Sequence, residues 1–211
     1  MPPQPDGMWR STYNGQKWVN AEGEDRFRRA VYTYLKRTTP YPSMTTFDGG
    51  SGEVCQIRRI RTNTPLQALV TLNDPVYLEA AGALAKRMAA IEGNPADRAE
   101  HGLRLALIRP IQDGESLPLT TLQQDVQKSY SAKSLDASSL IHSSGTTTPG
   151  GMSDAEFASW IVVANTILNL DQFLTRNETG RFTTRNRLVA ADIGWRQTCE
   201  SRRRFRSSQS P

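Results

Sequence analysis

Two helix-start signals, ten residues apart, constrain the fold of this chain more than any other feature. Asn63-Thr64-Pro65 and Asn73-Asp74-Pro75 each place a capping residue directly before a proline. A capping side chain accepts a hydrogen bond from the first helical turn, and proline suits the first helical position because the N–H there has no partner within the helix. We therefore expect the chain to begin one helix, turn sharply and begin a second.

Apolar residues at helical spacing extend this expectation along most of the chain. The helix after Pro75 is predicted to end at Gly93, Asn94-Pro95 opens another that runs to Pro110, and a weaker helix covers residues 119–130. Ser153 to Glu156 has the pattern of a capping box, in which serine and glutamate each bond the other's backbone N–H. An earlier helix is predicted over residues 22–37, and its expected inner face consists of Phe27, Val31, Tyr34 and Leu35.

Signals for β structure are confined to the first sixty residues. Asn14-Gly15 lies between aromatic-containing flanks, which favours a small hairpin over residues 9–19, and residues 54–60 form a possible short strand. The predicted fold class is mainly α: a compact helical domain with a small N-terminal β-hairpin or short strands, plus a flexible linker and tail.

Composition divides the chain into four parts. Residues 1–130 form the predicted helical core, and residues 131–152, rich in serine, threonine and glycine, form a linker or surface loop. Residues 153–176 are expected to form a C-terminal helix that packs back on the domain. Residues 177–211 form an arginine-rich tail that we expect to be disordered.

The net charge of +5 suggests an anionic partner until the position of the charge is considered. From residue 181 onward there are eight arginines and two acidic residues, which leaves 18 basic and 19 acidic residues in the preceding 180. The electrostatic footprint of a nucleic-acid binder is thus restricted to the tail, where nucleic-acid binding is one hypothesis. The first residues, MPPQPDG, lack the features of a signal peptide, and no apolar stretch is long enough to span a bilayer, so the sequence itself predicts a soluble chain.

Four motifs occur in a fixed order: QPDGMW, GEDR, KRT-x-PYPSM-x-TFD and RTNTPLQAL-x-x-LNDP, followed later by LRLALIRP and WIVVANTILNLDQFLT. As a set they resemble the C-terminal domain of unknown function of large exported planctomycete proteins, many of which carry an N-terminal cytochrome-c-like segment. The resemblance covers about residues 2–176, and the tail has no counterpart in it.

This resemblance implies a noncatalytic structural or interaction domain of a larger exported, cytochrome-c-associated protein. The haem-attachment motif C-x-x-C-H is absent from this chain, so no cofactor is expected in it, and haem c is expected only in upstream domains. Those upstream domains are the implied partners, and the implied localisation is periplasmic or extracellular. The family has no established activity to transfer, and no catalytic set is complete in the sequence.

Arg58, Arg59 and Arg61 form the best candidate binding site, because they precede the helix start at Pro65, whose free N–H groups also attract an anion. An anionic or sulfated glycan is the alternative partner that this cluster suggests, with Asp48 or Glu53 as acid–base groups. The competing interpretation is internal ion pairing with Glu22, Glu24, Asp25 or Asp48. The same acidic residues lack the spacing of a metal site, so no metal is predicted.

Overall fold

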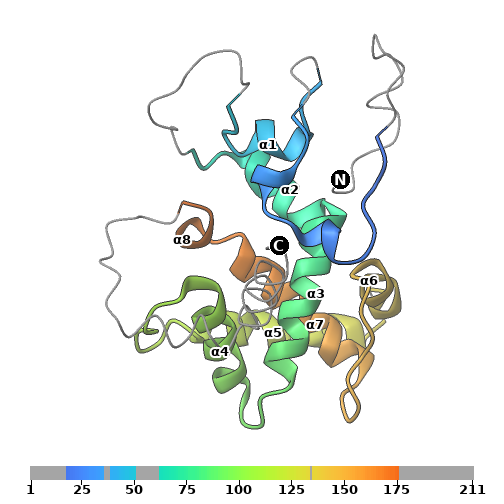
Figure 1. Cartoon of the computed structure of the whole chain (residues 1–211). Coiled ribbons are helices and arrows are strands. Elements are labelled where there is room, and N and C mark those ends of the chain that lie inside the picture. The colour runs from blue at the N-terminus through green and yellow to red at the C-terminus, as the bar shows by residue number, and fades with distance from the viewer. Residues whose placement is uncertain (1–17, 36–38, 51–61, 134, 176–211) are drawn as a thin grey trace, which may run out of the picture.

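The structure is a computed structural model that describes residues 18–35, 39–50, 62–133 and 135–175. Within these residues it contains ten helical elements and no strand, which confirms the prediction of a mainly α fold (Figure 1). The elements are η1 (Gly23–Phe27), η2 (Ala30–Tyr32), α1 (Pro42–Thr46), α2 (Pro65–Asn73), α3 (Pro75–Ala89), α4 (Pro95–Leu107), α5 (Leu117–Ser131), α6 (Ala137–Ser143), α7 (Asp154–Leu168) and α8 (Asp171–Leu174). Most of the predicted hairpin lies outside the described residues. The predicted short strand and the tail lie entirely outside them.

The predicted helix starts are present with their caps. Thr64 accepts a hydrogen bond from the backbone N–H of Gln67 at 3.3 Å, and the Gln67 side chain accepts one from the Thr64 N–H at 2.9 Å, which completes a capping box. Asp74 caps α3 by accepting from the Val76 N–H at 2.9 Å. Local capping chemistry therefore fixes the sharp turn between α2 and α3.

Helix α7 is the centre of the core. It packs against α3, α5, α6 and α4, and Figure 1 shows it crossing behind α3 with α4 to one side and α6 to the other. Ten of its fifteen residues are buried, including Phe157, Trp160 and Ile161, none of which has any exposed surface. Burial of each such side chain contributes about 1.5–3 kcal/mol to folding, so this helix dominates the apolar contribution to stability.

Two glycines allow helices to approach closely. A Cβ atom at Gly102 on α4 would lie 2.7 Å from the Sδ of Met88 and 3.1 Å from the Cδ1 of Ile167. A Cβ atom at Gly82 on α3 would lie 2.7 Å from the Cγ2 of Thr146. These separations are shorter than ordinary contacts, so a larger residue at either position would require its neighbour to move.

The prediction of a continuous helix over residues 22–37 is wrong for the described part of that range. Two short 3-10 turns, η1 and η2, take its place, and Phe27 and Val31 are 69% and 76% exposed instead of facing inward. The segment contains a glycine and a run of β-branched and aromatic residues, all of which disfavour an α-helix. Its described contact with the helical body is an ion pair, Arg26 Nη2 to Glu79 Oε2 at 2.8 Å, which requires no helical face.

Residues 131–152 were expected to be a linker or surface loop, and the structure places helix α6 within them. Asp136 caps this helix by accepting from the backbone N–H groups of Ser138 and Ser139 at 3.0 and 3.3 Å. Ile141 is buried against α7, and Ser144 is fully buried at the helix end. Ala137, Leu140 and Met152 pack against the core as well, so a cap and a few apolar contacts order a segment whose composition shows no periodicity.

None of the helices in the described part of the chain combines the length and the apolar character that crossing a membrane requires.

Candidate functional site

Gln67 is the centre of a polar junction at the start of the motif that runs from residue 61 to residue 75. Only 2% of its surface is exposed. Its Nε2 donates hydrogen bonds to the backbone oxygen of Thr46 at 2.9 Å and to Thr62 Oγ1 at 3.0 Å, while its Oε1 accepts from the Thr64 N–H. One side chain therefore holds the end of α1, the approach to α2 and the first turn of α2 together.

Asp48 completes this junction on the side of α1. Its carboxylate accepts hydrogen bonds from the backbone N–H of Thr62 at 2.8 Å and from Thr62 Oγ1 at 2.9 Å, and Gln67 Nε2 approaches it to 3.5 Å. The residue has a φ of 58°, in the left-handed region that non-glycine residues rarely adopt. Asp48 was predicted as an acid–base group, and the structure engages its carboxylate in joining two chain segments 14 residues apart.

Further polar links join α2 to the C-terminal helices. Thr71, which is fully buried, contacts Asn169 with 2.7 Å between Oγ1 and Oδ1. Asn165 donates from Nδ2 to the backbone oxygen of Leu72 at 3.2 Å, and its own buried Oδ1 has no hydrogen-bond partner. Asn63 donates to Asp171 at 2.8 Å at the start of α8. The motif is thus fastened at both ends of α2 to elements a hundred residues further along the chain.

Of the five predicted binding residues, Asp48 alone lies among the described residues. Arg58, Arg59, Arg61 and Glu53 lie outside them. The anion site and its glycan ligand therefore stay predictions. Of the acidic residues considered as ion-pair partners for these arginines, Asp25 pairs with Arg28 at 2.6 Å.

The aromatic side chains near this junction are packed against one another. Trp18 stacks on Tyr41 with 5.6 Å between ring centroids, and Phe47 packs at 5.7 Å against Tyr77. Burial, followed by the charge of Asp74, raises the pKa of Tyr77 to about 12, so its hydroxyl stays protonated at neutral pH. These rings therefore serve packing in this part of the structure.

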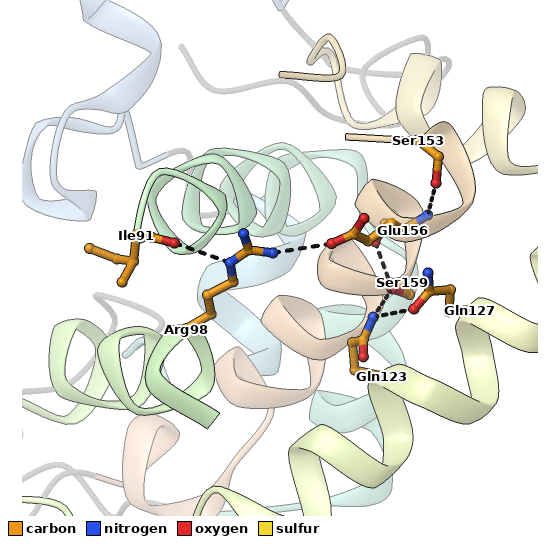
Figure 2. Close-up of polar contacts among 7 residues, drawn as sticks. All are labelled: Ile91, Arg98, Gln123, Gln127, Ser153, Glu156 and Ser159. Carbon is orange, nitrogen blue, oxygen red and sulfur yellow. Dashed lines mark hydrogen bonds and ion pairs between the residues drawn. The ribbon is translucent and has the colours of Figure 1, made fainter. Parts of the chain in front are cut away.

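A second polar cluster, shown in Figure 2, fastens the start of α7. Arg98 donates to the backbone oxygen of Ile91 at 3.1 Å and pairs with Glu156 Oε1 at 3.1 Å (Figure 2). Ser153 caps α7 as predicted, by accepting from the Glu156 N–H at 3.2 Å. The predicted return bond from the Glu156 side chain is replaced by its ion pair with Arg98, which links α7 to the turn between α3 and α4.

The same cluster reaches α5 through buried groups. Ser159 donates to the backbone oxygen of Glu156 at 2.6 Å and accepts from Gln123 Nε2 at 3.0 Å (Figure 2). Gln123 also donates to Gln127 at 2.9 Å. Sequence reasoning missed both sites. The pattern Thr64-x-x-Gln67 is that of a capping box and could have identified Gln67. The cluster at α7 has no local sequence signal because its members are far apart in the sequence.

The chemistry of both clusters is that of structural fastening. Their members are amides, hydroxyls, the Asp48 carboxylate and one ion pair, and they bond both to backbone groups and to one another. Burial and the nearby Arg104 and Arg87 lower the pKa of His101, which keeps that imidazole neutral at pH 7. Among the described residues, histidine, cysteine, aspartate and glutamate side chains nowhere gather in threes or more in a way that could hold a metal ion.

Comparison with known proteins identifies a family. Residues 1–122 match the family described as PSD1, protein of unknown function (DUF1553). No curated protein and no solved structure matches the chain. The match covers more than half of the 211 residues and includes the whole junction around Gln67. The chain therefore belongs to the PSD1 family of proteins of unknown function.

Proposed function

We propose that this chain is a noncatalytic interaction domain of a larger exported, cytochrome-c-associated protein, and that it docks onto the upstream domains of that protein. The observation that carries the proposal is the position of its exposed apolar side chains. Of eleven large hydrophobic residues that are exposed among the described residues, nine lie between residues 19 and 72. They are Val19, Phe27, Val31, Tyr32, Tyr34, Leu35, Leu66, Leu69 and Leu72.

This concentration differs from an ordinary surface. Single exposed apolar residues are common, whereas apolar residues that form a contiguous patch mark a surface that binds another protein. Figure 1 shows α1 and α2 at one end of the molecule, with the blue N-terminal segment running beside them. Burying a fully exposed side chain of this kind contributes about 1.5–3 kcal/mol, so covering half of these would contribute several kcal/mol to docking.

The finer parts of the proposal rest on the sequence motifs. The order of GEDR, PYPSM-x-TFD and RTNTPLQAL-x-x-LNDP supports a place in an exported protein with a cytochrome-c-like segment. In that setting the haem would be attached to an upstream domain through C-x-x-C-H. The present chain would contribute a rigid helical body and an apolar docking surface, and the protein would act in the periplasm or outside the cell.

The test begins with the gene. An open reading frame that continues in frame upstream of Met1 and encodes C-x-x-C-H is expected, and the upstream polypeptide should be produced with its haem attached. Isothermal titration calorimetry should then show that it binds the present chain, with a negative heat-capacity change because apolar surface is buried. Absence of such a reading frame, or no binding at concentrations up to about 1 mM, the effective concentration that a linker supplies, would overturn the proposal.

A further inference from the structure

Helix α2 has its polar residues inside and its leucines outside. Gln67 and Thr71, one turn apart, are 2% and 0% exposed. Leu66, Leu69 and Leu72 are 58%, 59% and 43% exposed. With 3.6 residues per turn, the leucines are centred on the side of the helix opposite the two polar residues. An amphipathic helix at a protein surface normally has the reverse arrangement.

Hydrogen bonds fix this orientation. Gln67 is bonded to Thr46 and Thr64, and Thr71 is joined to Asn169 of the segment that follows α7. Rotating α2 to bury its leucines would break these bonds and leave buried polar groups unpaired, at a cost of about 1–3 kcal/mol for each group. The exposure of the leucines is therefore built into the fold.

We propose that Leu66, Leu69 and Leu72, the leucine face of α2, are covered by an apolar, uncharged surface of the upstream part of the same longer polypeptide. This inference rests on the proposed function and names the place where docking occurs. Helix α2 has no charged residue between Pro65 and Asn73. A partner surface carrying a charge at this position would lose its hydration without gaining an opposite charge, so the matching surface is apolar.

The size of the leucine face selects a tethered partner over a second copy of this chain. The three leucines are each only about half exposed, so together they supply a small part of the about 800 Å² that each partner buries in a stable complex of separate chains. A surface this small gives weak association between free molecules. Covalent linkage raises the effective concentration of the partner to the millimolar range, at which weak docking becomes nearly complete.

The experiment compares three chains: the native chain, the double variant Leu66→Ser with Leu69→Ser, and the control Leu117→Ser. Leu117 is 67% exposed at the start of α5, outside the leucine face. The probe is the upstream polypeptide added in trans. We expect the double variant to bind it at least tenfold more weakly than the native chain, and the control to bind within twofold. Urea unfolding of each chain verifies that all three are folded.

Each outcome decides a different point. Equal binding by all three chains would overturn the leucine face as the docking site and leave the proposed function standing. No binding by the native chain at concentrations up to about 1 mM, which matches the effective concentration that covalent linkage supplies, would remove the proposed function itself. If sedimentation shows that the native chain dimerises below 100 µM and the double variant does not, the leucine face pairs with a second copy, and the tethered partner is wrong.

Discussion

Replacing Gln67 by leucine tests whether the buried amide holds the motif in place. The two side chains are similar in size, so the substitution removes hydrogen bonds with little change in packing volume. Gln67 Nε2 no longer donates to the Thr46 oxygen, and Gln67 Oε1 no longer accepts from the Thr64 N–H. Thr62 Oγ1 and Asp48 also lose their contacts with Nε2, but they stay bonded to each other, so the main cost falls on the two backbone groups.

The expected loss of unfolding free energy follows from these two groups. An unpaired buried backbone group costs about 1–3 kcal/mol, and both groups here are only partly buried, so the lower half of that range applies. The more apolar leucine offsets part of the cost. We expect a net destabilisation of about 2 kcal/mol, which corresponds to a decrease of about 1 M in the urea midpoint.

Urea unfolding followed by tryptophan fluorescence measures this change, because Trp160, one of the four tryptophans, is fully buried in the native state and becomes exposed on unfolding. Gln124→Leu is the matched control, since Gln124 is exposed on α5 and the same exchange there should change stability by less than about 0.5 kcal/mol. If Gln67→Leu leaves the midpoint within 0.3 M of the native value, by our estimate about 0.5 kcal/mol, the junction is not a fastening point. Gln67→Glu adds a second check: it places a carboxylate beside Asp48, so its destabilisation should grow as the pH rises from about 4 to 6.

Three further outcomes are expected. Gly102→Val should destabilise the chain by about 2 kcal/mol or more in the same urea assay, because its side chain would overlap Met88, whereas Gly102→Ala should cost less since the methionine can move. Tyr77 should titrate near pH 12 by absorbance at 295 nm. Because its pKa is higher in the folded state than the usual 10, its contribution to stability is complete below pH 10 and is lost between pH 10 and 12. Tyr77→Phe should remove this contribution to the pH dependence of stability. A chain ending at residue 133 lacks α7, so its circular dichroism signal should change on heating without a cooperative transition. A cooperative transition would show that α7 is dispensable for folding.

The sequence predicted best what is decided locally. Thr64 and Asp74 cap their helices because a capping side chain needs only the backbone of the next few residues. Ser153 caps α7 for the same reason. The Glu156 side chain was predicted less well, because Arg98, 58 residues away, offers it a charged partner that local sequence does not reveal. Distant partners override a local motif when they supply a stronger bond.

Periodicity by itself does not say which face of a helix lies inside. Phe27 and Val31 have helical spacing, yet they lie on short turns with both side chains exposed. On α2 the spacing of Leu66 and Leu69 is helical too, and the helix is present, but these leucines face outward. A hydrophobic stripe indicates that a surface will be covered, and the covering partner need not belong to the same folded body. Of the site prediction, Arg58, Arg59 and Arg61 lie outside the described residues.

The segment that matches the family and the unit that folds have different boundaries. The match ends at residue 122, within α5, whereas the most buried helix, α7, begins at Asp154. Helices α3, α4 and α5 all direct their apolar faces at α7, so the matched segment alone would expose the surface that α7 covers. The matched segment also contains the leucine face of α2. Its three leucines are each at least 43% exposed in the described structure. The matched segment thus lies between two apolar contacts, one satisfied by α7 within this chain and one that, on our proposal, is satisfied by the rest of a longer protein.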